Sequence, residues 1–168
     1  MATTYELIAS TTVGSGGTAT IDFNSIPQTY TDLLLKISDR NNRSALNDAI
    51  GLNFNGSSSS YSGRRLYGDG SNATSDTESV YGIIDNATTS TSNTFANIEF
   101  YIPNYTSSNY KSISVDGVQE NNATTAYSTL FTSLWSNTSA ITSINIKLQN
   151  ATLFLQYSTA YLYGIKNS

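Results

Sequence analysis

Residues 94–103 read TFANIEFYIP, and this stretch decides the fold class. Apolar side chains recur at every second position, at Ala96, Ile98, Phe100 and Ile102. Successive side chains of a β-strand point to opposite faces, so a period of two marks a strand with one buried face. The stretch therefore predicts a half-buried strand. The proline that follows ends it, because proline lacks the N–H that a sheet needs.

The same alternation recurs along most of the chain, while the 3.6-residue period of amphipathic helices is nearly absent. Short strands separated by turn residues are typical of sandwiches and barrels. We therefore expect one all-β domain over residues 1–168, an antiparallel, jelly-roll-like β-sandwich with two four-stranded sheets. Its first two strands should form a hairpin. The predicted strands cover residues 4–12, 18–24, 31–40, 49–55, 80–84, 94–102, 111–119, 126–135, 141–149, 152–156 and 159–165.

One region departs from this pattern. Between residues 56 and 94, serine, glycine and asparagine are frequent and the apolar alternation weakens. Clusters of these residues are typical of surface loops, because their side chains and backbones favour turns. Apart from the short strand expected at 80–84, we predict long loops here that leave the sandwich.

The composition excludes the commonest catalytic chemistries. The 168 residues include no histidine and no cysteine, and only 12% are charged. A disulfide, a thiolate metal site and a histidine base are therefore impossible. The carboxylates do not follow the spacing of a calcium loop, and the glycine cluster at 13–17 lacks the lysine and helix of a phosphate-binding loop. We predict no catalytic, cofactor-binding or metal-binding residue, and no enzyme.

The charge and hydropathy patterns also restrict the partners. Nucleic-acid binding needs a basic surface, whereas the net charge here is −4. No stretch approaches the ~20 apolar residues of a membrane span. The first residues lack the basic and apolar regions of a signal peptide. We therefore expect a chain made in the cytoplasm, with neither a nucleic acid nor a membrane as its partner.

Two basic clusters are candidate contacts. Arg40 and Arg43 lie in a polar segment that begins at Asp39, and Arg64 and Arg65 are adjacent. Solvated arginines on a surface contribute little to stability. At a subunit interface, by contrast, a guanidinium can pair with a carboxylate through two hydrogen bonds. Both interpretations stand at this point, and the second predicts that these residues lie at subunit contacts.

The tyrosines allow two interpretations as well. In a sandwich, tyrosine packs in the core with its hydroxyl on a polar partner. At an interface, it offers a large contact area. Tyr61, Tyr105 and Tyr110 are expected in loops and are candidate contacts with a subunit or a carbohydrate. Three others are expected in the core: Tyr5, Tyr127 and Tyr163.

Several segments of the chain resemble a group of small virion structural proteins of tailed bacteriophages, of cyanophages in particular. The resemblance spans nearly the whole chain, and the group offers no catalytic motif to match. It includes Tyr61 and the segment Arg64-Arg65-Leu66. The other matching segments are YELI at 5–8, VGSGG at 13–17, SIPQTYTDL at 25–33, LNFNG at 52–56 and AYLYGI at 160–165.

The resemblance implies a capsid decoration (cement) protein on the outer surface of the virion, made in the host cytoplasm. Such a protein would bind the major capsid protein, bridge capsomers as a homotrimer and need no cofactor, and the candidate contact residues would then meet a subunit or the capsid. The alternative is a receptor-binding module of a tail fibre that recognises host-surface carbohydrate in a groove lined by tyrosine and asparagine. The first predicted strand starts close to Met1, without the long shaft expected of a fibre, which favours the decoration protein.

Overall fold

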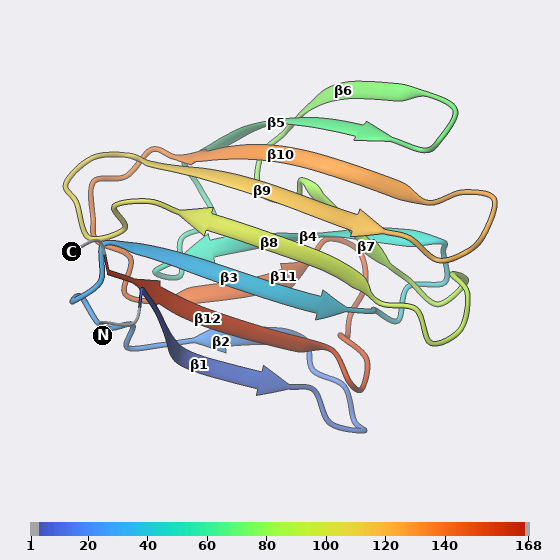
Figure 1. Cartoon of the computed structure of the whole chain (residues 1–168), viewed down its shortest axis with the longest axis horizontal. Coiled ribbons are helices and arrows are strands. Elements are labelled where there is room, and N and C mark those ends of the chain that lie inside the picture. The colour runs from blue at the N-terminus through green and yellow to red at the C-terminus, as the bar shows by residue number, and fades with distance from the viewer. Residues whose placement is uncertain (1–3, 167–168) are drawn as a thin grey trace.

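The computed structural model describes residues 4–166, so residues 1–3 and 167–168 of the predicted domain lie outside the described residues. Over that range the chain is all-β, as predicted, with twelve strands in two antiparallel sheets (Figure 1). The larger sheet has eight strands. In spatial order they are β1 (Tyr5–Thr12), β12 (Thr159–Ile165), β3 (Asp32–Asp39), β8 (Ala96–Ile102), β9 (Lys111–Gln119), β10 (Tyr127–Trp135), β5 (Tyr61–Gly68) and β6 (Ala73–Glu78).

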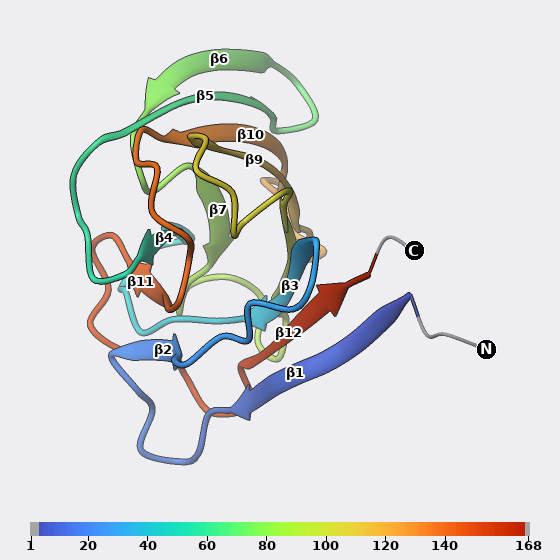
Figure 2. The same ribbon diagram turned by 90° about the vertical axis from the view of Figure 1, so that its left-hand side faces the viewer.

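The smaller sheet has four strands and packs against the middle of the larger one (Figure 2). This arrangement confirms the predicted β-sandwich. The two sheets are unequal, however, with eight and four strands where two sheets of four were expected. The strands of the smaller sheet are, in spatial order, β2 (Thr20–Phe23), β11 (Ile144–Leu148), β4 (Asn47–Phe54) and β7 (Ile83–Asn86).

The core lies between the two sheets, and the alternation in the sequence identifies its side chains correctly. On β8, Ala96, Ile98, Phe100 and Ile102 are all 0–2% exposed, as the opening stretch predicts. The facing strands contribute their own alternate positions, β11 among them with Ile144, Ile146 and Leu148. Burial of each large aliphatic side chain contributes about 1.5–3 kcal/mol, so this two-layer core supplies most of the stability.

One end of the core is aromatic. The indole of Trp135 on β10 lies edge-on to Phe54 on β4, with ring centroids 5.5 Å apart, and stacks on Tyr61 at 6.2 Å. The backbone N–H of Phe54 donates to the Tyr61 hydroxyl at 2.8 Å. In the segment after β8, the buried Tyr105 donates its hydroxyl to the carbonyl of Pro27. We call Phe54, Tyr61, Tyr105 and Trp135 the aromatic end.

The predicted N-terminal hairpin is wrong. β1 pairs with β12, and β2 pairs with β11 in the other sheet, so the turn between them crosses from one sheet to the other. Alternation shows that a strand has one apolar face but does not say which strand is its neighbour. β1 lies at the edge of the large sheet, and Tyr5, which was expected in the core, is 56% exposed. Tyr127 and Tyr163 are partly buried.

The predicted long loops between residues 56 and 94 are also wrong in part. The region contains the β5–β6 hairpin and β7. The hairpin extends beyond the smaller sheet (Figure 2). Its inward face is therefore covered by charged side chains, since Arg65 forms ion pairs with Asp76 at 2.6 Å and Glu78 at 3.1 Å. A strand that packs on no second sheet needs no apolar alternation, which is why its sequence resembles a loop.

Most strand ends differ from the predictions by one to three residues, and one predicted strand is absent. The strand expected at 80–84 begins at Ile83. The segment 152–156 forms no strand, and only Phe154 makes isolated bridges, to Thr18 and Asn41.

At the edge of the large sheet, the N–H of Lys166 donates to the carbonyl of Thr4 at 3.1 Å, next to the Tyr5–Ile165 pair of β1 and β12.

Candidate interaction surface

The outer face of the large sheet is continuous across all eight strands, because directly paired residues on neighbouring strands point to the same face. One row of such pairs crosses the whole sheet from β6 to β1. It includes apolar, charged and hydroxyl side chains, so the face offers several kinds of contact. In order, the row is Ser75, Leu66, Leu130, Asp116, Glu99, Lys36, Tyr161 and Ser10.

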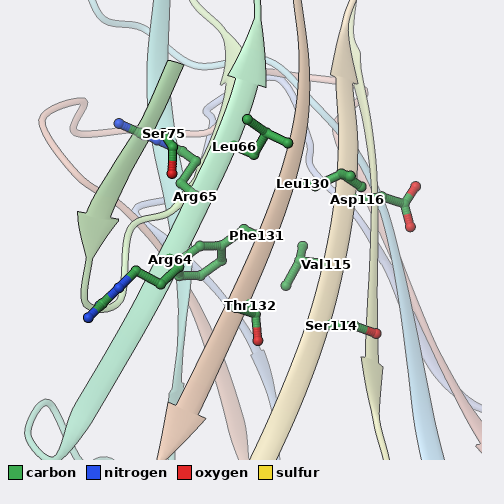
Figure 3. Close-up of a pocket in the computed structure, with 10 residues that line it drawn as sticks. All are labelled: Arg64, Arg65, Leu66, Ser75, Ser114, Val115, Asp116, Leu130, Phe131 and Thr132. Atoms are coloured by element: carbon green, nitrogen blue, oxygen red, sulfur yellow. The ribbon is translucent and has the colours of Figure 1, made fainter. Parts of the chain in front are cut away.

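Exposed aliphatic side chains form the first feature of this face. Leu66 on β5 pairs directly with Leu130 on β10, and Val118 lies on the neighbouring β9. The three are between 43% and 59% exposed, and we call them the leucine patch. Open grooves of about 390 and 340 Å³ run along the two sides of the Leu66–Leu130 pair. Figure 3 shows the first groove, with Arg64 on one side of the leucines and Asp116 on the other.

Tyrosines form the second feature of the same face. Tyr5 and Leu7 on β1, Tyr101 on β8 and Tyr161 on β12 are between 37% and 56% exposed, and we call them the tyrosine patch. The Tyr101 hydroxyl donates to Asp32 at 2.8 Å. This hydrogen bond, followed by burial, raises the pKa of Tyr101, so its ring is held in place as a neutral phenol. Rings that are fixed in advance lose little entropy when a partner binds.

An ion pair separates the two patches. Lys36 on β3 bonds to Glu99 on β8 at 2.7 Å, and this contact raises the pKa of Lys36. Among residues 4–166, seven of the nine exposed large hydrophobic side chains belong to the two patches; the other two are loop tyrosines. The outward row of the smaller sheet, by contrast, is polar, with Asp22, Asn145 and Asn53 in register. Large apolar exposure is therefore concentrated on one sheet.

Three predicted contact residues are buried within the chain. Asp39, Arg40 and Tyr105 present no surface to a partner, which corrects the prediction made from their polar surroundings. Asp39 and Tyr105 point into the two ends of the core. Arg40 is bound by the segment after β7, whose carbonyls accept from both of its terminal nitrogens at 2.9–3.1 Å: Thr88, Ser90, Thr91 and Thr94.

The remaining predicted contact residues differ in how many of their interactions are made within the chain. Arg43 bonds to Asp48 at 3.1 Å, and Arg65 holds the β5–β6 hairpin, so the carboxylates expected from another subunit are supplied internally. Tyr61 is half-buried in the aromatic end. Tyr110 and Arg64 are exposed. Within the described part of the chain, the guanidinium of Arg64 donates only to the carbonyl of the preceding residue, at 2.8 Å.

A buried carboxyl pair occupies the end of the core opposite the aromatic end. Asp39 continues the inward series of β3, and Asp85 on β7 pairs with Asp48 on β4. Asp85 accepts from the Asn41 side chain at 2.7 Å. Asp48 accepts from two backbone N–H groups and from Arg43. With Gln119 at the end of β9, the three aspartates form what we call the acidic end.

The burial of Asp39 and Asp85 favours one retained proton on this pair of carboxyls. Both are fully buried, and the oxygens of Asp39 have no donor among the described residues. Burial, followed by the charge of Asp85, raises the pKa of Asp39 well above its usual value, and burial also raises the pKa of Asp85. Two carboxylates at such a site cannot both ionise, so a proton on Asp39 supplies the missing hydrogen bond to Asp85.

The two ends of the core are also possible places for a ligand. Within residues 4–166, no three metal-ligating side chains are close enough to hold an ion. A groove of about 610 Å³ lies among loops at the acidic end, next to Arg40 and Tyr157. Both terminal nitrogens of the Arg40 guanidinium already donate to backbone carbonyls, so they are not available to bind an anion in this groove. The exposed patches of the large sheet are the largest groups of exposed apolar side chains in residues 4–166.

The leucine patch was not predicted from the sequence, although a signal for it exists. Leu130 and Leu134 occupy one face of β10 while Phe131 and Trp135 occupy the other. When both faces of a strand are apolar, either other layers cover the strand on both sides or one apolar face is exposed. Here the smaller sheet covers only the inward face, and the outward Leu130 remains exposed.

Comparison with known protein families, characterised proteins and solved structures finds no match to this chain. No helix in residues 4–166 is long and apolar enough to cross a membrane. The geometry of the two patches is therefore the basis on which a function is proposed.

Proposed function

We propose that this chain is a capsid decoration protein of a tailed phage, which binds the outer shell and stabilises it by bridging capsomers. The observation that carries the proposal is the concentration of large apolar side chains on one broad sheet face. Contiguous exposed patches of this kind mark protein-binding surfaces. The tyrosine patch is the surface for the major capsid protein, because tyrosine is enriched at protein interfaces. The resemblance to phage virion proteins is the reason for proposing a phage particle.

The mechanism is mass action. A protein that binds the assembled shell and not its free subunits lowers the free energy of the shell. Each contact made by Tyr5, Leu7 and Tyr161 is small, but many copies on one particle act together. Bridging requires each copy to reach two capsomers, either alone or as the expected homotrimer. The rigid two-layer core keeps the patches in a fixed geometry.

The tail-fibre alternative is less well supported. A carbohydrate groove was expected to use Tyr61, Tyr105 and Tyr110. Tyr105 is buried and Tyr61 is packed in the aromatic end, so only Tyr110 of the three is fully available to a sugar. Three of the five exposed tyrosines of residues 4–166, Tyr5, Tyr101 and Tyr161, lie instead on a broad sheet face, which suits a protein surface better than a saccharide.

Copy number and shell binding test the proposal. We expect hundreds of copies per particle, located on the shell, and higher thermal stability of stripped shells when the purified chain is added back. Tyr161→Asp should abolish this gain, because it places a charge in the tyrosine patch. Tyr157→Asp is the matched control, since Tyr157 is an exposed tyrosine in a loop. A handful of copies at the tail, or full shell binding by Tyr161→Asp, would contradict the proposal.

A further inference from the structure

The leucine patch has charges of opposite sign on its two sides. Arg64 lies on β5 next to Leu66, and Asp116 lies on β9, directly across from Leu130. Both charged residues are exposed on the outer face. Neighbouring strands are about 4.8 Å apart, so the strand register places the two Cα atoms roughly 12 Å apart. Leu130 lies between them, and they form no ion pair with each other or with another described residue.

This pattern is self-complementary. A two-fold axis that passes between Leu66 and Leu130 places Leu66 of one copy over the partner's Leu130, and the reverse. The same rotation brings Arg64 toward the partner's Asp116, and it does so twice. A two-fold contact requires this property, because each residue must meet a complement that the identical surface also supplies.

We propose that the leucine patch is a self-association surface, at which two copies of this chain meet across a two-fold axis. Leu66 and Leu130 form the apolar centre of the contact, and the Arg64–Asp116 pairs lie at its rim. The proposal is independent of the phage assignment, and it leaves the tyrosine patch of both copies free for a different partner.

The chemistry of the patch favours a second copy over an unrelated partner. Apolar side chains at the centre with charges at the rim are typical of protein interfaces. The groove beside the leucines, about 390 Å³ in volume, gives the partner's leucines a place to pack. Because arginine and aspartate are already present at matching positions, no other protein is needed to neutralise either charge.

A pair of charge reversals tests the contact directly. Arg64→Asp alone and Asp116→Arg alone each place like charges opposite one another at both rims, so each variant should lose self-association in sedimentation equilibrium. A mixture of the two variants restores opposite charges at both rims. We expect the mixture to form dimers with one copy of each variant, with a dissociation constant within about tenfold of the wild type.

Controls separate loss of contact from loss of fold. Leu130→Asp should weaken the wild-type dimer by about tenfold or more, with an unchanged urea midpoint, since Leu130 is exposed in the single chain. Leu7→Asp is the matched control on the same sheet face, outside the leucine patch, and should leave the dimer unchanged. Raising the salt concentration should weaken the wild-type dimer through its rim charges.

Specific outcomes would overturn the proposal. A wild-type chain that stays monomeric at every accessible concentration has no such contact. A trimer or other oligomer that is unaffected by Leu130→Asp uses a different surface. Charge-reversed variants that fold but do not pair when mixed would show that Arg64 and Asp116 do not meet. None of these outcomes bears on shell binding, which is measured separately with Tyr161→Asp.

Discussion

The two ends of the sandwich core are both buried and differ in chemistry. At the aromatic end, Phe54 and Trp135 pack ring against ring. At the acidic end, Asp39 and Asp85 are just as buried, and burial raises the pKa of both carboxyls. The difference teaches that burial alone does not say what stabilises a site. One end is sensitive to shape, and the other to pH.

Removing the largest ring should have the largest effect on this comparison. Trp135→Ala leaves a cavity at the aromatic end, and we expect a loss of about 3–5 kcal/mol in the free energy of unfolding. Urea titrations at pH 5 and pH 8 should give nearly the same loss, because the indole that is removed does not titrate. Trp135→Phe, which keeps an aromatic ring against Phe54, should cost less. A loss that depends strongly on pH would remove the distinction between the two ends.

Removing the guanidinium of Arg40 tests the polar side of the comparison. Arg40→Met keeps the stem of the side chain but leaves the carbonyls of the 88–94 segment without their donor. Because each unsatisfied buried group costs about 1–3 kcal/mol and some of these carbonyls will gain water, we expect a loss of about 3 kcal/mol. Amide hydrogen exchange should accelerate in residues 87–94. Arg64→Met, at an exposed arginine, serves as the control, and equal losses in the two variants would contradict the prediction.

The shared proton of the acidic end predicts a pH dependence. The raised pKa of Asp39 means that the folded chain keeps a proton which the unfolded chain releases above about pH 4. The folded state then binds more protons, so the free energy of unfolding falls as pH rises from about 4 to the raised pKa. The slope is about 1.4 kcal/mol per pH unit for one retained proton.

Asp39→Asn supplies a permanent N–H donor to Asp85 in place of that proton. We expect the variant to lose this slope, so that it gains stability relative to the wild type at each step from pH 5 to pH 8. Urea midpoints measured across this range give the comparison, with Asp22→Asn as a control at an exposed aspartate. Parallel pH profiles for Asp39→Asn and the wild type would mean that the pair does not retain a proton.

The smallest expected effect lies at the aromatic end, where one hydrogen bond accompanies the ring packing. Tyr61→Phe keeps the ring on Trp135 but removes the acceptor of the Phe54 N–H, so we expect a loss of about 1 kcal/mol. Burial raises the pKa of Tyr61 to about 12, so this loss should be constant from pH 5 to pH 8. Tyr157→Phe is the control. A loss as large as that of Trp135→Ala would mean that hydrogen bonding, and not packing, dominates this end as well.

The inward faces of the strands could be predicted from the sequence, because alternation directly reflects which side chains leave water. The series Leu33, Leu35 and Ile37 also extends to Asp39, so the inward position of this aspartate was implied by the same rule. Its polar neighbours Arg40 and Arg43 suggested a loop instead. In that prediction the polar residue types were given more weight than the periodicity, although the periodicity placed Asp39 correctly.

Strand pairing and the exposed patches could not be predicted in the same way. Which strands pair depends on contacts between residues far apart in the chain, such as Leu66 with Leu130 or Tyr5 with Ile165. The residues of one strand do not by themselves indicate which strand it pairs with. The β5–β6 hairpin was missed for a related reason, because beyond Tyr61 it extends past the smaller sheet and so needs no apolar face.

The pairing of the first and last strands also determines how the domain would carry a mechanical load. Tyr5 lies opposite Ile165 and Thr12 lies opposite Thr159, so both ends of the described chain emerge at the same end of one antiparallel ladder. Tension applied at these two ends breaks the hydrogen bonds of the ladder one after another, so little force is needed at each step. Force transmitted through contacts on the broad face of the large sheet does not act directly on the pairing of β1 with β12. We therefore expect the domain to unfold at a lower force when it is pulled by its two ends than when force is applied through its faces.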